Sequence, residues 1–141
     1  MRGTVRRSGY LREATIAFGL AKAAARVFSV GRLLAWANKH PRRLSRFRDH
    51  EVAWIDWAVA TVAARTHAGR TSLPAALATQ MMLRRRGIAS RLCIGIEPAD
   101  AITSHAWVEV ADGRVVGEID TRHFVKFSLS APSGTSATAA T

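Results

Sequence analysis

Apolar side chains recur every three or four residues over residues 10–38, which predicts a helical segment. The alanine-rich composition of this segment favours helix as well. Glycines weaken the helix, and residues 29–31 are the expected break. Residues 1–9 lack the pattern and are expected to be frayed or disordered. Pro41 ends the segment, because the residue before a proline avoids the α region.

A second helix is predicted from Asp49 to about Arg65, with Asp49 as a possible N-cap. Trp54 and Trp57 fall on its apolar face. Their spacing favours core anchors over a platform for stacking nucleic-acid bases.

A third helix is predicted to begin at Thr71 or Ser72, since either hydroxyl can cap it and Pro74 suits its first turn. Gly87 is a helix-end signal. It follows Arg84–Arg86, which we expect to form a solvated helix end that suits the negative pole of the helix dipole.

The pattern then changes to strands. Residues 90–96 predict one strand, with Cys93 on the side opposite to its aliphatic residues, and residues 97–103 predict a loop. Residues 105–110 and 114–119 predict a hairpin, because Asp-Gly between them is a strong two-residue turn signal.

The rest of the chain divides by composition. Residues 123–127 are rich in strand formers and could add one more strand. Residues 128–141 are of low complexity and are expected to be disordered. We therefore expect a basic helical segment over 1–48, a core over 49–127 and a disordered tail over 128–141.

The charge is uneven. The 141 residues carry a net charge of +11, and all of that excess lies in residues 1–48, which hold twelve Arg or Lys and one acid. One interpretation is a solubilising helical face, and the other is a docking surface for an acidic partner, a membrane or nucleic acid. Nucleic-acid binding is the less favoured function, because this segment lacks aromatic residues interleaved with the basic ones. A single cysteine excludes an intrachain disulfide framework and fits a reducing compartment.

No uninterrupted apolar run is long enough to span a bilayer. Arg6 and Arg7 precede an apolar stretch, as in a signal peptide, but charges interrupt that stretch, so we interpret it as a helix of the mature protein.

Three residue types in this order suggest nucleophilic catalysis. A nucleophile at a helix N-terminus, the place of Ser72, feels the positive end of the helix dipole. His105 on a strand could take and return a proton, and an acid behind it would fix its tautomer. Cys93 lies in mid-strand without such activation, so a buried structural thiol is expected there. The histidines show no metal-ligand spacing, and we predict no metal.

Which acid could orient His105 depends on the register of the predicted hairpin. With a two-residue turn, Glu118 lies opposite Trp107 and Asp120 opposite His105, all on one face. A three-residue loop would shift the register by one and turn both acids away.

The stretch T-S-L-P-A-A-L-A-T-Q-M-M-L-R-R-R-G-I-A-S-R-L-C-I-G-I, followed by S-H-A-W-V-E-V-A-D-G-R-V-V-G-E, resembles the transglutaminase-like leader peptidase of lasso-peptide biosynthesis, in the stand-alone form found in split systems. The similarity covers about residues 50–127. It implies an α+β fold in which N-terminal helices pack on a small transglutaminase/papain-like core with an antiparallel sheet.

The resemblance implies a cytoplasmic Cys-His-acid peptidase without a cofactor that removes the leader from a ribosomal precursor peptide. A small leader-binding partner protein would present the precursor, and an ATP-dependent cyclase would act afterwards. By the same resemblance Ser72 holds the nucleophile position, His105 is the base, and Glu118 is preferred to Asp120 as the acid because it follows V-V-G.

Where the family has cysteine, this chain has Ser72. Either the serine is an inactivating replacement, which we favour because its surroundings are intact, or it is natural. A natural serine would make the chain a serine peptidase or an inactive peptide-binding module.

Overall fold

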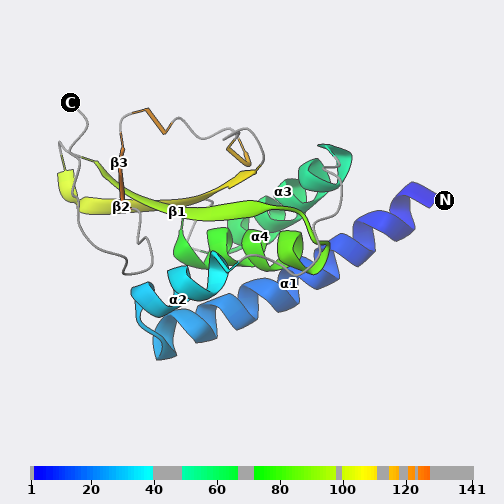
Figure 1. Ribbon diagram of the computed structural model, residues 1–141. Coiled ribbons are helices and arrows are strands. Elements are labelled where there is room, and N and C mark those ends of the chain that lie inside the picture. Colours follow the sequence, from blue (N-terminus) through cyan, green and yellow to red (C-terminus); the bar gives the residue numbers. More distant parts are fainter. Residues whose placement is uncertain are drawn as a thin grey trace.

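The computed structural model of the chain describes residues 2–39, 49–66, 72–97, 100–110, 115–117, 121–122 and 124–127. In these residues it has four helices and three strands (Figure 1). They are α1 (Arg2–Val27), α2 (Val30–Ala37), α3 (Asp49–Ala64), α4 (Leu73–Arg85), β1 (Ser90–Glu97), β2 (Asp100–Val110) and β3 (Val125–Phe127). The predicted α+β class is confirmed.

The first helix begins much earlier than its pattern indicates. The prediction that residues 1–9 are frayed is wrong for residues 2–9, which belong to α1. Tertiary packing explains the difference: Tyr10 stacks on Trp54, and the Arg7 guanidinium lies 5.6 Å from the Trp54 ring and 5.8 Å from the Trp57 ring. The two tryptophans hold the outer part of α1 rather than the core, and Trp57 is 37% exposed, so the core-anchor prediction is wrong for it.

The break near residues 29–31 is confirmed. α1 ends at Val27, and Ser29 caps α2 by accepting a hydrogen bond from the Arg32 backbone N–H at 3.3 Å. The predicted boundary between residues 48 and 49 adjoins residues 40–48, which lie outside the described part, as does the expected tail over 128–141.

The strands form an antiparallel sheet of order β2-β1-β3. β1 is confirmed where it was predicted, and it pairs with β2 so that Leu92 lies opposite Val108. The loop predicted over residues 97–103 is wrong from Asp100 onward, because β2 begins there and Glu97 pairs with it. Two strand formers, Ile102 and Thr103, favour that extension.

The predicted hairpin partner of β2 is not a strand in the described residues 115–117. A single bridge joins Glu109 to Val115, and the Val116 N–H donates to Val108 O at 2.8 Å. The two-residue-turn register pairs Glu109 with Val116, so that register is wrong by one. Gly117 then has φ of 88°, a left-handed conformation that interrupts strand geometry.

The strand predicted over residues 123–127 is confirmed for Val125–Phe127. It pairs with β1 rather than β2, with Lys126 opposite Gly95.

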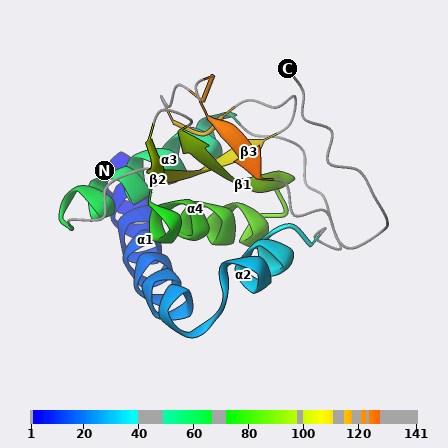
Figure 2. The same ribbon diagram turned by 90° about the vertical axis from the view of Figure 1, so that its left-hand side faces the viewer.

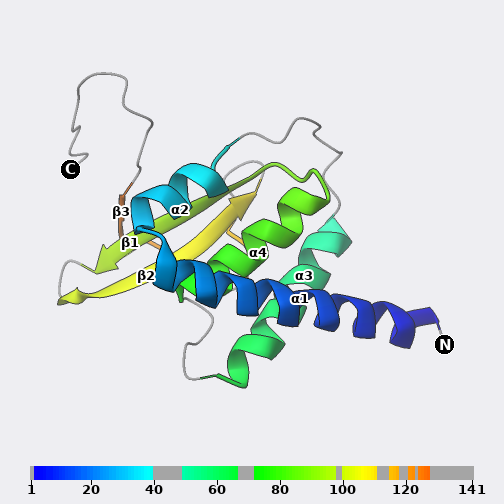
Figure 3. The same ribbon diagram turned by 90° about the horizontal axis from the view of Figure 1, so that it is seen from below.

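The helices form two levels below the sheet. In Figure 2, α4 lies between the sheet and the two N-terminal helices, and Figure 3 shows α1 crossing α3 and α4 from below. α4 is therefore buried on most of its surface, from Ala75 to Gln80 and again at Met82 and Leu83. Its buried residues share one hydrophobic cluster with α1, α2, α3 and the lower face of the sheet.

Hydrogen bonds connect the end of α2 both to β1 of the sheet and to α4. The Asn38 amide donates to Leu92 O at 3.3 Å, and its oxygen accepts from Leu92 N at 2.9 Å. Asn38 thus takes the place of a strand partner along the part of β1 that β3 does not reach. The Gln80 amide of α4 donates to Ala37 O.

The expected solvated arginine end of α4 is only partly observed. Gly87 ends the helix with φ of 68°, as predicted. Arg85 is exposed, but Arg84 lies 4.7 Å from the Trp36 ring and donates to the Trp36 carbonyl. Arg86 donates to both Glu13 oxygens at 2.8 and 2.7 Å, and this bond raises the pKa of its guanidinium. The prediction is wrong for Arg84 and Arg86, because they connect α4 to the N-terminal helices.

Candidate active site

Ser72 is the N-cap of α4, as predicted. Its backbone is extended (φ −73°, ψ 153°), and its Oγ accepts a hydrogen bond from the Ala75 N–H at 3.3 Å. Its carbonyl accepts the first intrahelical bond from Ala76 N at 3.0 Å. Pro74 lies in the first turn, where no backbone donor is needed. The side chain at position 72 is therefore at the positive end of the helix dipole, half-buried.

The first two turns of α4 lie beneath the strand that carries His105. Ala76 and Thr79 line a small cavity together with Ala106 and Val108 of β2. His105 immediately precedes this part of β2. The fold therefore brings together the two segments that the sequence predicts to hold the nucleophile position and the base.

The His105 ring belongs to the upper side of the sheet. Ala106, Val108 and Val110 join the core below, and alternation places His105 on the other face. Its ring lies 4.7 Å from the ring of Phe124, at an interplanar angle of 52°. The direct pairing of Ser72 with His105 stays a prediction.

An aromatic cluster covers the strand beside His105. Trp107 is 1% exposed, and its ring lies 5.9 Å from that of Phe124. Both side chains lie directly on Gly95, where an added Cβ would be 2.7 Å from Trp107 and 2.8 Å from Phe124. Phe124 was not among the predicted site residues. Gly95 within a strand was the available signal, because such a glycine often marks close approach of another group.

The predicted acids Glu118 and Asp120 lie outside the described residues. The register that placed them on the face of His105 is not the observed one, so the acid that orients His105 stays a prediction that rests on the resemblance alone. Glu109, on the same face as His105, has another role. It accepts from Trp107 Nε1 at 3.2 Å and forms an ion pair with Lys126 of β3. Burial raises the pKa of Glu109, but the hydrogen bonds from Lys126 and Trp107 outweigh it, and the net pKa is lowered. Glu109 therefore joins β2 to β3.

Cys93 is a buried thiol, as predicted, and the structure pairs it with Trp107 of β2. Burial, followed by the nearby charge of Glu109, raises its pKa to about 11. The thiol is protonated at neutral pH, which is the reverse of what a cysteine nucleophile needs.

Among the residues that the structure describes, no group of three or more His, Cys, Asp or Glu could hold a metal ion. In the same part of the chain, none of the helices combines the length and apolarity needed to cross a membrane.

The model of one protein family matches residues 14–128, which is most of the chain, and that family is described as the Transglutaminase-like superfamily. No curated protein and no solved structure matches the chain. The match begins within α1 and ends just after β3, so it includes the Ser72 helix, the His105 strand, α2 and the second half of α1. This chain belongs to the Transglutaminase-like superfamily.

Proposed function

We propose that this chain has the architecture of a cysteine-type leader peptidase that acts on a ribosomal lasso-peptide precursor in the cytoplasm. The observation that carries the proposal is Ser72 at the N-cap of α4, a helix whose first two turns line a cavity together with the part of β2 that follows His105, in a Transglutaminase-like chain. The superfamily includes cysteine peptidases and acyltransferases, and both begin with attack on a carbonyl carbon. Leader removal comes from the motif resemblance.

The helix N-terminus explains why position 72 suits a nucleophile. A thiol there would have a lowered pKa, because the helix dipole and the first-turn N–H groups favour its anion. The same N–H groups would hold the negative oxygen that forms on the scissile carbonyl. His105 would take the nucleophile's proton and return it to the leaving amine, with Glu118 or Asp120 orienting its ring.

Ser72 makes this chain a weak or inactive form of such an enzyme, because a hydroxyl is a poorer nucleophile than a thiol. That residue also favours a second function, an inactive module that binds the peptide in the same site. A small leader-binding protein would present the precursor in either case, and the ATP-dependent cyclase would follow cleavage.

The test is mass spectrometry of a candidate precursor peptide, incubated with its leader-binding protein and with either this chain or Ser72→Cys. We expect cleavage by Ser72→Cys and little or none by the unchanged chain. His105→Ala in the Ser72→Cys background should abolish that cleavage while the fold, followed by circular dichroism, is retained.

Cleavage by both chains would show that Ser72 is itself competent. No cleavage by Ser72→Cys, with precursor binding intact, would contradict the peptidase and favour the binding module.

A further inference from the structure

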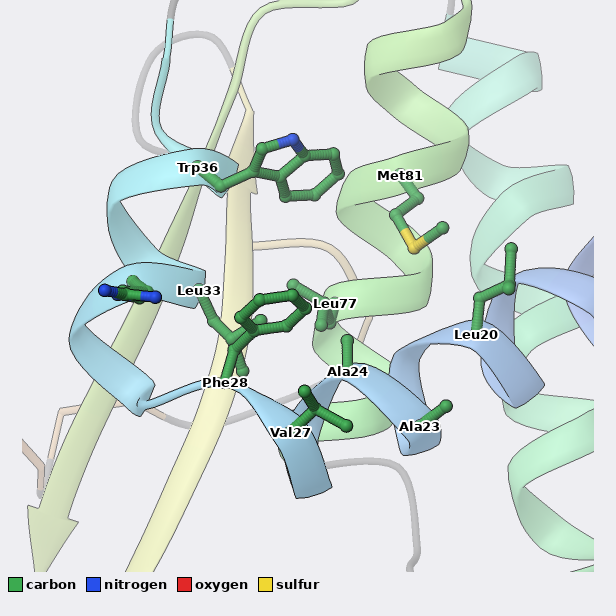
Figure 4. Close-up of a pocket in the computed structure, with 10 residues that line it drawn as sticks. Leu20, Ala23, Ala24, Val27, Phe28, Leu33, Trp36, Leu77 and Met81 are labelled. Atoms are coloured by element: carbon green, nitrogen blue, oxygen red, sulfur yellow. The ribbon is translucent and has the colours of Figure 1, made fainter.

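An open apolar groove lies on the side of the molecule away from the sheet. It is bounded by α1, α2 and α4 and has a volume of about 620 Å³. Figure 4 shows Trp36 of α2 and Met81 of α4 facing the groove, with Leu33 and Phe28 lower down. Apart from Arg32, its lining is apolar: Leu20, Ala23, Ala24, Val27, Phe28, Leu33, Trp36, Leu77 and Met81.

Several large apolar side chains that line the groove are strongly exposed to solvent. Val27 is 74% exposed, Leu20 56%, Phe28 49% and Trp36 43%. Single exposed apolar residues are ordinary, but a contiguous group at a concave site marks a binding surface. Exposed aromatic residues such as Trp36 are typical energetic centres of interfaces.

The groove continues along α1. A second, smaller hollow shares Leu20 and Met81 with it and extends to Ile16, which is 65% exposed. The distance along α1 from Ile16 to Val27 is about 16 Å at the helical rise of about 1.5 Å per residue. That length matches about three turns of a docked helix, enough for apolar anchors at positions i, i+3 or i+4, and i+7.

The elements around the groove are strongly basic. α1, α2 and α4 together hold nine Arg or Lys residues and one acid. That acid, Glu13, is already bonded to Arg86 and lies 3.5 Å from Arg85. Arg32 lines the groove itself. A ligand therefore meets apolar walls within a positive field.

We propose that this groove binds an amphipathic helix with an acidic polar face, carried by another protein. Apolar side chains of that helix would fill the space between Trp36, Val27 and Leu20, and its carboxylates would face the surrounding arginines. The inference does not rest on the proposed peptidase activity, because it concerns a different surface and is tested by binding.

Charge and shape favour this occupant over others. A second copy of the chain would bring two faces of the same positive sign together, which opposes association. A bilayer suits an apolar face that projects into it, whereas these side chains line a hollow. Residues 128–141 of this chain contain no acid and no aromatic residue, so this segment lacks the side chains that would suit a basic, apolar groove.

The probe is a fluorescein-labelled synthetic helix of about 18 residues, with Leu and Phe at i, i+3, i+4 and i+7 spacing and Glu on its polar face. A peptide with Lys in place of every Glu is its control. Fluorescence anisotropy should detect the Glu peptide and not the Lys peptide, and its affinity should fall as salt increases.

The structure offers a closely matched pair of variants. Val27 in the groove and Val5 at the other end of α1 are 74% and 73% exposed. Val27→Gln should weaken binding of the Glu peptide about tenfold, because burial of a valine is worth about 1.5 kcal/mol. Val5→Gln should leave that affinity unchanged. Circular dichroism melting shows whether both variants keep the fold.

Four results would overturn the proposal: equal binding of the Lys peptide, no binding of either peptide, equal weakening by Val5→Gln, or a different occupant. A dimer in light scattering that Val27→Gln abolishes would assign the groove to a second copy. Binding to phosphatidylcholine/phosphatidylglycerol vesicles that Val27→Gln abolishes, without binding of the Glu peptide, would assign it to a membrane.

Discussion

Gly95 is the residue at which the aromatic cluster meets the backbone of the sheet. Trp107 and Phe124 lie so close that any Cβ there would force one of them to move. We expect Gly95→Ala to destabilise the chain by roughly 1–3 kcal/mol, the usual cost of overpacking a filled site. Urea unfolding followed by tryptophan fluorescence would measure this.

Gly19 gives the matched control, because a Cβ there meets nothing within 4 Å. It lies in the middle of α1, where alanine is the better helix former by about 1 kcal/mol. Gly19→Ala should therefore stabilise the chain. If both substitutions shifted stability in the same direction, close packing at Gly95 would not be the cause.

Cys93 should react only slowly with thiol reagents in the folded chain. Its pKa of about 11 leaves almost no thiolate at pH 8, and the side chain is buried. Iodoacetamide should label it slowly at about pH 8 in the native chain and quickly in urea. In Ser72→Cys the introduced thiol should react first, and adding Cys93→Ala should leave any peptide cleavage unchanged. Loss of cleavage would identify Cys93 as the nucleophile.

At the scale of elements, one ion pair fixes α1 to α4. Glu13 and Arg86 bond through two oxygens and are 17% and 22% exposed, so Glu13→Ala would leave a half-buried cation without its carboxylate. We expect a loss of about 1–3 kcal/mol in unfolding free energy. Arg85→Ala is the control, since Arg85 is 76% exposed at 3.5 Å from the same carboxylate and should cost no more than about 0.5 kcal/mol. Equal losses would contradict this assignment.

The link between β2 and β3 should depend on pH. The pKa of Glu109 is lowered from its ordinary value of 4.5, so folding favours the ionised carboxylate. This contribution is present above pH 4.5 and is lost as the pH falls through the lowered pKa. Glu109→Gln should thus lower the melting temperature at pH 7, and the difference from the unchanged chain should shrink towards about pH 3. A difference that did not change with pH would point to packing instead of charge.

Local signals predicted the ends of several elements, but they did not predict which strands pair with each other. Ser72 and Gly87 mark the limits of α4 through hydrogen bonds and backbone angles that a few neighbouring residues determine. Asp-Gly predicted that β2 forms a hairpin with the following segment, but β2 pairs along its length with β1, and the other edge of β1 pairs with β3 from much later in the chain. Phe124 was missed for the same reason, since its contact with His105 joins residues far apart in the sequence.

At the scale of the whole molecule, the N-terminal helices are part of the core as well as a source of charge. Phe18 and Leu34 are 3% exposed, and Ala14 is fully buried. Deleting residues 1–39 should therefore abolish cooperative thermal unfolding, because the lower side of α4 would lose its cover. Circular dichroism melting tests this, and an unchanged transition would contradict it.

Point substitutions can test whether the positive charge of the N-terminal helices is needed for folding. Arg12 and Arg26 are exposed on α1, so Arg12→Gln with Arg26→Gln should lower the charge and leave the melting transition in place.

The place of α1 at the bottom of the fold has a consequence for biosynthesis. The ribosome produces this helix before the elements on which it packs, and its ion-pair partner Arg86 lies 73 residues later than Glu13. The Leu92 backbone, which receives Asn38, likewise follows it by 54 residues. Until α3 and α4 have been synthesised, the buried face of α1 lacks its main packing partners, and the nascent chain exposes it to chaperones and to other chains. This domain is therefore most prone to aggregation during its synthesis, before α3 and α4 are available, rather than after it has folded.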